Sequence, residues 1–209
     1  MVEIREITSL SPVIPVVTLS DLDQAVPLAR ALLAGGARVI EVTRGPVAFA
    51  AIEAIRKALP AAIIGVGTLT RARDFAAADR AGAQFGVTPG LTAELAAASR
   101  GARFPVLPGV MTPTEVMTAR NAGFSVLRLF PAREAGGVAF LRAMAAAFPD
   151  LLFCPDCGIT PDVAGEYLSQ PNVACIAGSW LTPIAMLSAG NWAGIESLAR
   201  EAMRLKRLT

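Results

Sequence analysis

The chain has 209 residues, of which 54% are hydrophobic, and its 19 basic and 17 acidic residues give a formal net charge of +2. A chain of this length and hydrophobicity can bury a sizeable core, so we expect a single domain over residues 1–209. The charges are scattered and form no basic patch of the kind that attracts nucleic acid or a membrane surface, so we expect neither partner.

The amino end and the cysteines indicate the compartment. The first ten residues, MVEIREITSL, carry charges and lack the apolar segment of a signal peptide. Gly, Pro or a charge interrupts every apolar run before it reaches membrane-spanning length. Three cysteines in a chain of this length do not make a disulfide framework. We therefore expect a soluble cytoplasmic protein.

The residue types that are missing narrow the chemistry. The sequence contains no histidine, which excludes Ser-His-Asp catalysis, Cys-His catalysis and His-ligated metals. The segment CPDC, from Cys154 to Cys157, has the spacing of a metal or redox motif, but Cys175 is the only other cysteine. A zinc site needs a second pair of ligands, so we interpret these cysteines as structural and expect no metal.

Short apolar runs rich in β-branched residues recur along the chain and predict strands. The eight runs begin at Val13, Arg38, Ala62, Gln84, Phe104, Ser125, Leu151 and Val173. The segments between them are rich in Ala and Leu and have the 3–4-residue apolar spacing of amphipathic helices.

Capping residues mark the expected helix boundaries. Ser20, Thr70 and Thr112 stand at N-cap positions, and Pro113 follows Thr112 at the first helical position. Gly35, Gly82 and Gly123 stand where helices should end.

Strands that alternate with helices form a parallel sheet, because parallel strands need crossover connections. Eight such units predict an α/β fold of the (β/α)8 TIM barrel type. An open doubly wound sheet is the alternative. Against it, the first strand and loop, VVTLSDLDQA, lack the G-x-G-x-x-G turn of a dinucleotide-binding fold.

The carboxyl ends of barrel strands carry the functional residues, so the predicted strand ends are candidate site positions. They contain small and polar residues and a few charges, namely Glu41 to Arg44, Gly67–Thr68, Thr88 to Gly90, Pro108–Gly109, Arg128 to Pro131, Asp156 to Gly158 and Gly178–Ser179. Glycines at the last two strand ends allow backbone N–H groups to approach an anion, and loops after these strands often bind phosphate in barrels.

The chain contains, in this order, the segments VIPVV, ARALLAGGARVIEVT, GVGTLT, AGAQFGVTPGLT, LPGVMTPTE, LFPAREAGG, FCPDCGIT and CIAGSWLTP. In sequence and order they resemble the 2-keto-3-deoxy-6-phosphogluconate (KDPG) and 2-keto-4-hydroxyglutarate (KHG) aldolase family. The resemblance implies a class I aldolase, a lyase that makes or cleaves pyruvate aldol products through a lysine Schiff base without metal or cofactor. It also implies a homotrimer, which the Ala- and Leu-rich helices favour, and a keto acid or phosphorylated keto-sugar acid as substrate.

The same resemblance assigns roles to individual positions. It implies that Glu41 is the general acid/base. It implies substrate contacts for Thr68, Pro89 and Phe130, and phosphate contacts for Cys157, Gly158, Gly178 and Ser179.

Arg128 is the main departure from the family pattern. The Schiff-base lysine of the family lies in a Lys-Phe-Phe-Pro segment, and the matching segment here is Arg128-Leu129-Phe130-Pro131. A guanidinium keeps its proton and offers no lone pair, so it cannot attack a ketone as a lysine amine does. The two lysines, Lys57 and Lys206, fall in predicted helices, where we expect them on the solvent face.

Two further departures fall at the same strand ends. The family segment Glu-Val-Thr-Leu-Arg-Thr is here Glu41-Val42-Thr43-Arg44-Gly45-Pro46, which displaces the arginine that meets the substrate carboxylate. Arg44 is the candidate to replace it. Asp156 takes the place of a family threonine beside the phosphate loop, where its charge would repel a phosphate by about 1 to 4 kcal/mol at ~4 Å.

The clustered departures leave three explanations open: a site rebuilt by engineering, a natural paralogue with other chemistry, or a single inactivating change. Two functions also stay open. One is an aldolase-type lyase with altered chemistry, and the other is a non-catalytic or engineered ligand-binding trimeric barrel.

A buried guanidinium needs a partner, and Glu41 and Asp156 are the carboxylates nearest to Arg128 in the predicted barrel. We therefore expect an ion pair between Arg128 and Asp156, or between Arg128 and Glu41 if Asp156 turns outward. A pair with Glu41 would predict a lowered pKa for that carboxylate.

Overall fold

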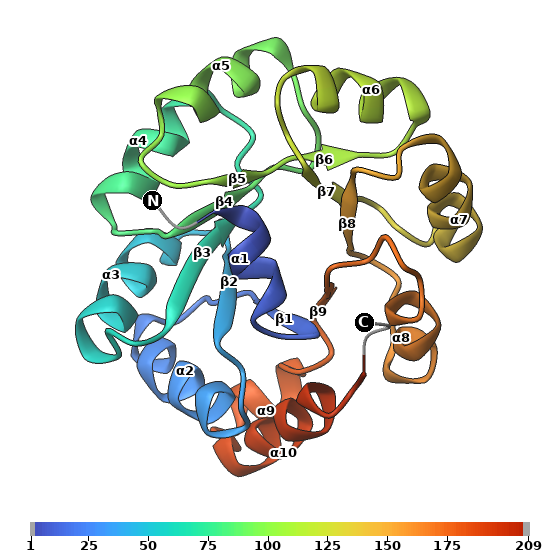
Figure 1. Cartoon of the computed structure of the whole chain (residues 1–209). Coiled ribbons are helices and arrows are strands. Elements are labelled where there is room, and N and C mark those ends of the chain that lie inside the picture. The colour runs from blue at the N-terminus through green and yellow to red at the C-terminus, as the bar shows by residue number, and fades with distance from the viewer. Residues whose placement is uncertain (1–2, 207–209) are drawn as a thin grey trace.

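The computed structural model describes residues 3–206 and shows parallel strands surrounded by helices (Figure 1). The strands are β1 (Val13–Val17), β2 (Val39–Thr43), β3 (Ile63–Gly67), β4 (Phe85–Val87), β5 (Val106–Leu107), β6 (Gly109–Val110), β7 (Val126–Leu129), β8 (Leu152–Pro155) and β9 (Ile176–Gly178). The helices are α1 (Ile4–Ser9), the 3₁₀ helix η1 (Leu22–Gln24), α2 (Ala25–Ala34), α3 (Ala48–Ala58), α4 (Ala72–Arg80), α5 (Ala93–Gly101), α6 (Pro113–Asn121), α7 (Gly137–Ala147), α8 (Pro161–Leu168), α9 (Ile184–Ser188) and α10 (Trp192–Met203).

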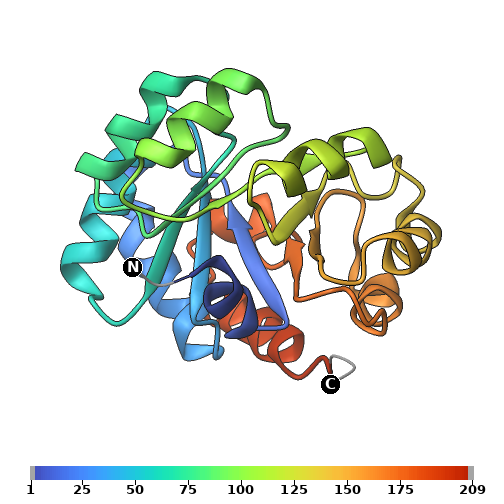
Figure 2. The ribbon, with the colours of Figure 1, turned by 45° about the horizontal axis from the view of Figure 1, so that its top comes forward.

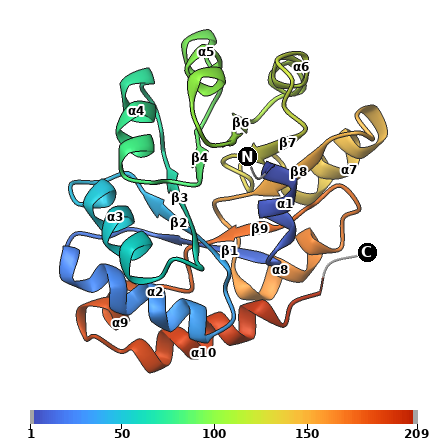
Figure 3. The same cartoon turned by 60° about the vertical axis from the view of Figure 1, so that its left-hand side comes forward.

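Every strand pair in the two sheets is parallel. A six-stranded sheet has the order β5-β4-β3-β2-β1-β9, and a three-stranded sheet has the order β6-β7-β8. Neighbouring strands follow one another along the chain, except where β9 lies beside β1, so the reversal of order that marks a doubly wound sheet does not occur among them. The fold is an α/β fold with parallel strands curled into a half-barrel (Figure 3).

Two points connect the sheets. On one side, Pro108 splits the predicted fifth strand into β5 and β6, because proline has no N–H to donate to the ladder. The chain still runs directly from one sheet into the other, and the Pro108 carbonyl accepts from Arg128 N at 2.8 Å. On the other side, an isolated parallel bridge joins Phe153 of β8 to Val173, just before β9.

Apolar side chains fill both faces of the strands, as expected for strands covered by helices. A large buried cluster lies between the strands and the surrounding helices and includes Ile40, Val42, Leu127 and Leu129. A smaller cluster lies inside the curled strands and consists of Ile7, Ile14, Val39, Phe85, Val87, Leu107, Val126, Cys154, Cys175 and Ala177. We call this smaller cluster the inner core.

Helix α1 covers the amino ends of the strands. In Figures 1 and 2 it lies across the middle of the ring of strands, and Ile7 is its contribution to the inner core. Arg5 fixes it by donating to Ser125 Oγ at 3.2 Å and to the carbonyl of Asp150 at 2.7 Å, both just before strands β7 and β8. The carboxyl ends of the strands lie on the side away from α1.

The caps agree with the sequence at one of three positions. Thr112 caps α6 in a capping box with Glu115, and Pro113 is the first helical residue. Ser20 is not a cap, because the neighbouring Asp21 carboxylate accepts from Asp23 N and starts η1 instead. Thr70 is not a cap either, because α4 begins at Ala72 after Arg71, which has no side-chain cap bond.

The part of the chain that the structure describes contains no helix long and apolar enough to cross a membrane.

Candidate functional site at the carboxyl ends of the strands

Strand alternation explains why charged side chains point inside the ring. Val39, Val126 and Cys154 belong to the inner core, and Glu41, Arg128 and Asp156 each follow one of them by two residues. Because side chains two residues apart lie on the same face of a strand, the three charged groups form the next layer toward the carboxyl ends. We call these three residues the charged layer.

The predicted ion pair is confirmed, and both carboxylates take part in it. Arg128 Nη1 donates to Asp156 Oδ2 at 2.7 Å, and Arg128 Nη2 donates to Glu41 Oε2 at 2.5 Å. The arginine is not bidentate to either acid; one nitrogen of the fork serves each. The Arg128 side chain is 1% exposed and Glu41 is 4% exposed, whereas Asp156 is 22% exposed and forms the solvent side of the layer.

The pairing of Arg128 is nevertheless incomplete. Its Nε is buried and has no hydrogen-bond partner among residues 3–206. An unpaired buried donor costs about 1–3 kcal/mol, so the charged layer is not an optimised structural ion pair.

Gly67 makes room for the Glu41 side chain. A Cβ at this position of β3 would lie 2.2 Å from Glu41 Oε1. The adjacent pairing of β2 and β3, with Thr43 opposite Gly67, brings the glycine beside the carboxylate. Gly67 was among the candidate positions at the strand ends, but its role in positioning Glu41 was not predicted, although a glycine inside a strand signals a close approach.

Burial dominates the electrostatics of Glu41. Loss of water raises the pKa of Glu41 above its ordinary value, Asp156 raises it further, and Arg128 opposes both by its charge and its hydrogen bond. The prediction of a lowered pKa was wrong, because it considered the ion pair and left out the desolvation of a buried carboxylate. The same two carboxylates hold the pKa of Arg128 well above its ordinary value in spite of burial, so it stays charged.

Arg44 has a carboxylate partner outside the charged layer. Its Nε lies 3.1 Å from Oδ2 of Asp74, a buried residue in the first turn of α4, without the geometry of a hydrogen bond. The backbone N–H of Arg44 donates to the carbonyl of Gly67 at 3.1 Å. Asp74 was not among the candidates from the sequence, where it reads as an ordinary acidic residue in a helix first turn.

The other predicted site residues follow the strands at their carboxyl ends. Thr68 comes directly after β3 and is exposed with φ 60°, a rare conformation for a β-branched residue. Pro89 and Phe130 are half-buried after β4 and β7, Gly178 ends β9, and Ser179 is exposed behind it.

The loop after β8 is held by Asp156. Its Oδ1 accepts from the backbone N–H of Cys157 at 2.7 Å, so the carboxylate joins the charged layer to the loop. Cys157 and Gly158 both have positive φ, 78° and 74°. Gly158 also packs on Arg133, whose Cβ would lie 2.5 Å from an added Cβ.

The two cysteines of the CPDC segment lie in different surroundings. Cys154 is buried and Cys157 is exposed, so the two sulfurs face different surroundings. Cys154 Sγ instead lies 3.3 Å from Cys175 Sγ in the inner core. Among the described residues, no group of three or more His, Cys, Asp or Glu side chains is placed to hold a metal ion.

Neither lysine belongs to the charged layer. Lys57 in α3 and Lys206 after α10 are exposed, and the expectation that Lys206 lies within the last helix was wrong, because α10 ends at Met203.

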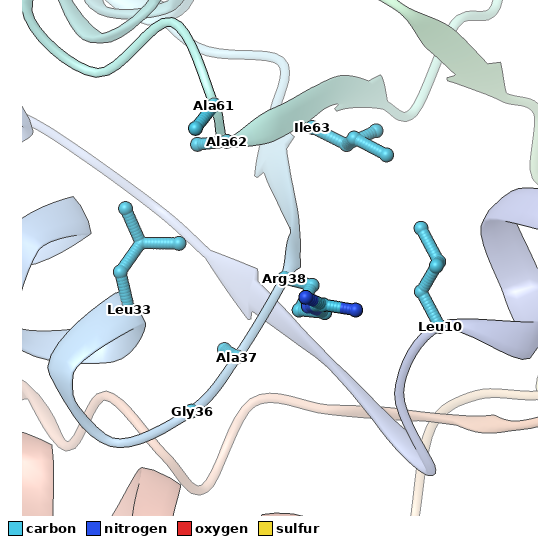
Figure 4. A pocket seen from close by; sticks show the side chains of 8 residues that line it. All are labelled: Leu10, Leu33, Gly36, Ala37, Arg38, Ala61, Ala62 and Ile63. Atoms are coloured by element: carbon cyan, nitrogen blue, oxygen red, sulfur yellow. The ribbon is translucent and has the colours of Figure 1, made fainter.

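A cavity lies at the opposite ends of the strands. This cavity of about 500 Å³ adjoins the starts of β2 and β3 and is mainly apolar, with Arg38 between Leu33 and Leu10 in the view of Figure 4. Its lining residues are Leu10, Leu33, Gly36, Ala37, Arg38, Ala61, Ala62 and Ile63. It contains one charged side chain and no carboxylate, so the charged layer is the better candidate for chemistry.

A curled parallel α/β fold with buried acid and base groups at the carboxyl ends of its strands is the architecture of many small-molecule enzymes. The model of the family "KDPG and KHG aldolase" matches residues 4–198. The chain is 43% identical over 205 residues to the KHG/KDPG aldolase of Escherichia coli K12, covering 98% of this chain and 96% of that protein. It is 43% identical over 200 residues to the 2-dehydro-3-deoxy-phosphogluconate aldolase of Pseudoalteromonas atlantica, covering 95% and 93%.

Solved structures agree. The KDPG aldolase of Legionella pneumophila, captured with pyruvate as a covalent carbinolamine intermediate, superposes with a TM-score of 0.93 at 40% identity, covering 95% of this chain and 97% of that one. The KDPG aldolase of Zymomonas mobilis ZM4, solved with 3-phosphoglycerate, gives a TM-score of 0.91 at 40% identity, covering 96% and 95%. The chain belongs to the KDPG and KHG aldolase family.

Proposed function

We propose that this chain binds a keto acid at the charged layer and acts on it without forming a Schiff base. The observation that carries the proposal is the burial of Arg128, at 1% exposure, between Glu41 and Asp156. A guanidinium held by two carboxylates stays protonated and has no lone pair for attack on a ketone.

The family relationship supports the assignment of Arg128 to the lysine position. The segment Arg128-Leu129-Phe130-Pro131 aligns in our reading with the Lys-Phe-Phe-Pro segment of the family. The Legionella relative was captured with pyruvate as a carbinolamine, an adduct that requires a nucleophilic amine. Lys57 and Lys206 are exposed, and neither belongs to the charged layer.

Glu41 is the proposed proton carrier. Its raised pKa brings it closer to neutral pH, where a carboxylate is a more effective general base. In this proposal Glu41 removes a proton from the carbon next to the keto group, and Arg128 stabilises the resulting enolate by its charge. Thr68, Pro89 and Phe130 contact the keto acid, and the positive charge of Arg44 is balanced by Asp74.

A second candidate function is a non-catalytic ligand-binding barrel. The observation that favours it is the 2.5 Å hydrogen bond from Arg128 to Glu41 Oε2, which occupies the oxygen that a base would use. Proton removal would then require the glutamate to present Oε1 or to leave the pair.

Exchange of the pyruvate methyl protons in D₂O separates the two candidates. We expect NMR to detect exchange above the buffer rate with the protein, and loss of that excess with Glu41→Gln. Glu53→Gln, on the exposed face of α3, is the matched control and should keep the exchange. No exchange above buffer would reject the catalytic proposal and leave the binding function.

We also propose that residues 1–209 form one domain with a closed (β/α)8 barrel. The proposal is supported by the β5–β6 run and by the bridge between Phe153 and Val173, which connect the two sheets on both sides.

We propose a homotrimer on the grounds of family membership and the Ala-rich helices. Light scattering at micromolar concentration should give three times the chain mass of 21.7 kDa. A mass of one chain would contradict it.

A further inference from the structure

A side-chain carboxylate occupies a backbone donor of the loop that follows β8. Asp156 turns back so that Oδ1 accepts from the N–H of Cys157, the next residue, at 2.7 Å. Its other oxygen, Oδ2, accepts from Arg128 at 2.7 Å. The two bonds fix the carboxylate between the charged layer and the loop.

Backbone N–H groups at this place in a barrel are suited to bind an anion, because the loops after the last two strands commonly hold phosphate. In this chain the Cys157 N–H is already occupied by Asp156 Oδ1. A phosphate could use that donor only by displacing a carboxylate that Arg128 also holds.

The fixed charges oppose a phosphate as well. Glu41 and Asp156 carry two negative charges and Arg128 one positive charge, and the nearby positive charge of Arg44 is paired with Asp74. Arg133 lies beside Gly158, but Asp162 and Glu166 line the same cavity of about 530 Å³. Burial raises the pKa of the Cys157 thiol, and the negative charges of Glu134 and Asp156 raise it further. The surroundings of the loop are therefore negative.

We propose that Asp156 is a specificity-determining residue that rejects phosphorylated ligands, so that the site takes short keto acids without a phosphate group. This inference rests on the proposed function, since it assumes that the ligand reaches the charged layer. Asp156 acts in two ways: it occupies the Cys157 N–H, and it adds a negative charge at the loop.

Titration calorimetry with 3-phosphoglycerate and glycerate as matched probes tests the proposal. We expect the protein to bind 3-phosphoglycerate no more tightly than glycerate. Asp156→Ala frees the N–H and removes the charge, so it should favour 3-phosphoglycerate over glycerate by about tenfold or more. Asp156→Asn removes the charge but keeps an acceptor for the N–H, so it should give a smaller gain and serves if the alanine variant fails to fold.

Asp162→Asn is the control, because it removes a nearby negative charge from the first turn of α8 and leaves the Cys157 N–H occupied. An equal gain with Asp162→Asn would overturn the specific role of Asp156. A wild-type preference for 3-phosphoglycerate of tenfold or more, or no gain with either Asp156 variant, would overturn it too. These readings concern binding alone, so they are independent of the proton-exchange test of the proposed function.

Discussion

Arg128 lies on β7 two residues after Val126, and the layer below it is the apolar inner core. Removing a guanidinium from water costs several kcal/mol unless it is paired. The two carboxylates supply that pairing, and they differ in exposure, at 4% for Glu41 and 22% for Asp156. The deeper partner should therefore contribute more to stability than the one that water reaches.

Alanine substitutions of the two carboxylates should separate their contributions to the free energy of unfolding. We expect Glu41→Ala to cost about 3–5 kcal/mol, because it removes the buried partner and leaves a cavity. Asp156→Ala should cost about 1–3 kcal/mol, because Arg128 keeps Glu41 and water can reach the vacated side. Urea unfolding at neutral pH measures both. Glu53→Ala, exposed on α3, is the control and should change stability by less than about 0.5 kcal/mol. Equal costs for the two variants would contradict this order.

Cys157 should be the cysteine that reacts in the native protein, and it should react slowly at neutral pH. Cys154 and Cys175 are buried, so iodoacetamide should add one group per folded chain. Burial, Glu134 and Asp156 raise the pKa of Cys157, so its thiolate forms at higher pH than that of free cysteine.

The alkylation rate of Cys157 should therefore rise at a higher pH than that of a model thiol, and Asp156→Asn should move the profile back toward lower pH. Mass spectrometry over a pH series measures both. A wild-type profile that matches free cysteine would show that the loop is not negative in character.

Among the elements, the strands and their inward faces were the most predictable part. All eight predicted runs contain strands, because apolar β-branched segments bounded by Gly and Pro leave few alternatives. The boundaries of single elements were less predictable. At Ser20 the neighbouring Asp21 forms the cap instead, and α4 begins two residues after Thr70.

Glycines in the strands set how closely the elements approach. A Cβ at Gly109 in β6 would lie 2.2 Å from the backbone carbon of Pro89, which cannot rotate away as a side chain can. We expect Gly109→Ala to lower the free energy of unfolding by about 2 kcal/mol or more, because overpacking typically costs about 1–3 kcal/mol. Urea unfolding measures this change.

Gly165→Ala in α8 is the matched control for Gly109→Ala. An added Cβ there meets nothing within 4 Å, so alanine should stabilise the helix by about 0.5–1 kcal/mol. If Gly109→Ala is tolerated equally well, the backbone contact between β6 and Pro89 is not as close as described.

For the whole molecule, the sequence predicted the parallel α/β fold, the family, and an ion pair of Arg128 with Asp156 or with Glu41. It did so because the two-residue alternation of strands fixes which side chains share the inside of the ring. Three contacts were not predictable: the pairing of Arg128 with both acids at once, the close approach of Glu41 to Gly67, and the pairing of Arg44 with Asp74. They depend on side-chain distances and on contacts between elements that sequence spacing does not determine.

The account depends on the absence of Schiff-base chemistry in the intact protein. Incubation with pyruvate and borohydride, followed by intact-mass measurement, tests this directly, because reduction traps an imine as a stable adduct. We expect no adduct with the wild-type chain and one reduced pyruvyl group with Arg128→Lys, whose amine can lose its proton in a desolvated site. Peptide mapping should place that group on position 128. A wild-type chain that gains the pyruvyl mass would contradict the account, and mapping to Lys57 or Lys206 would identify the amine responsible.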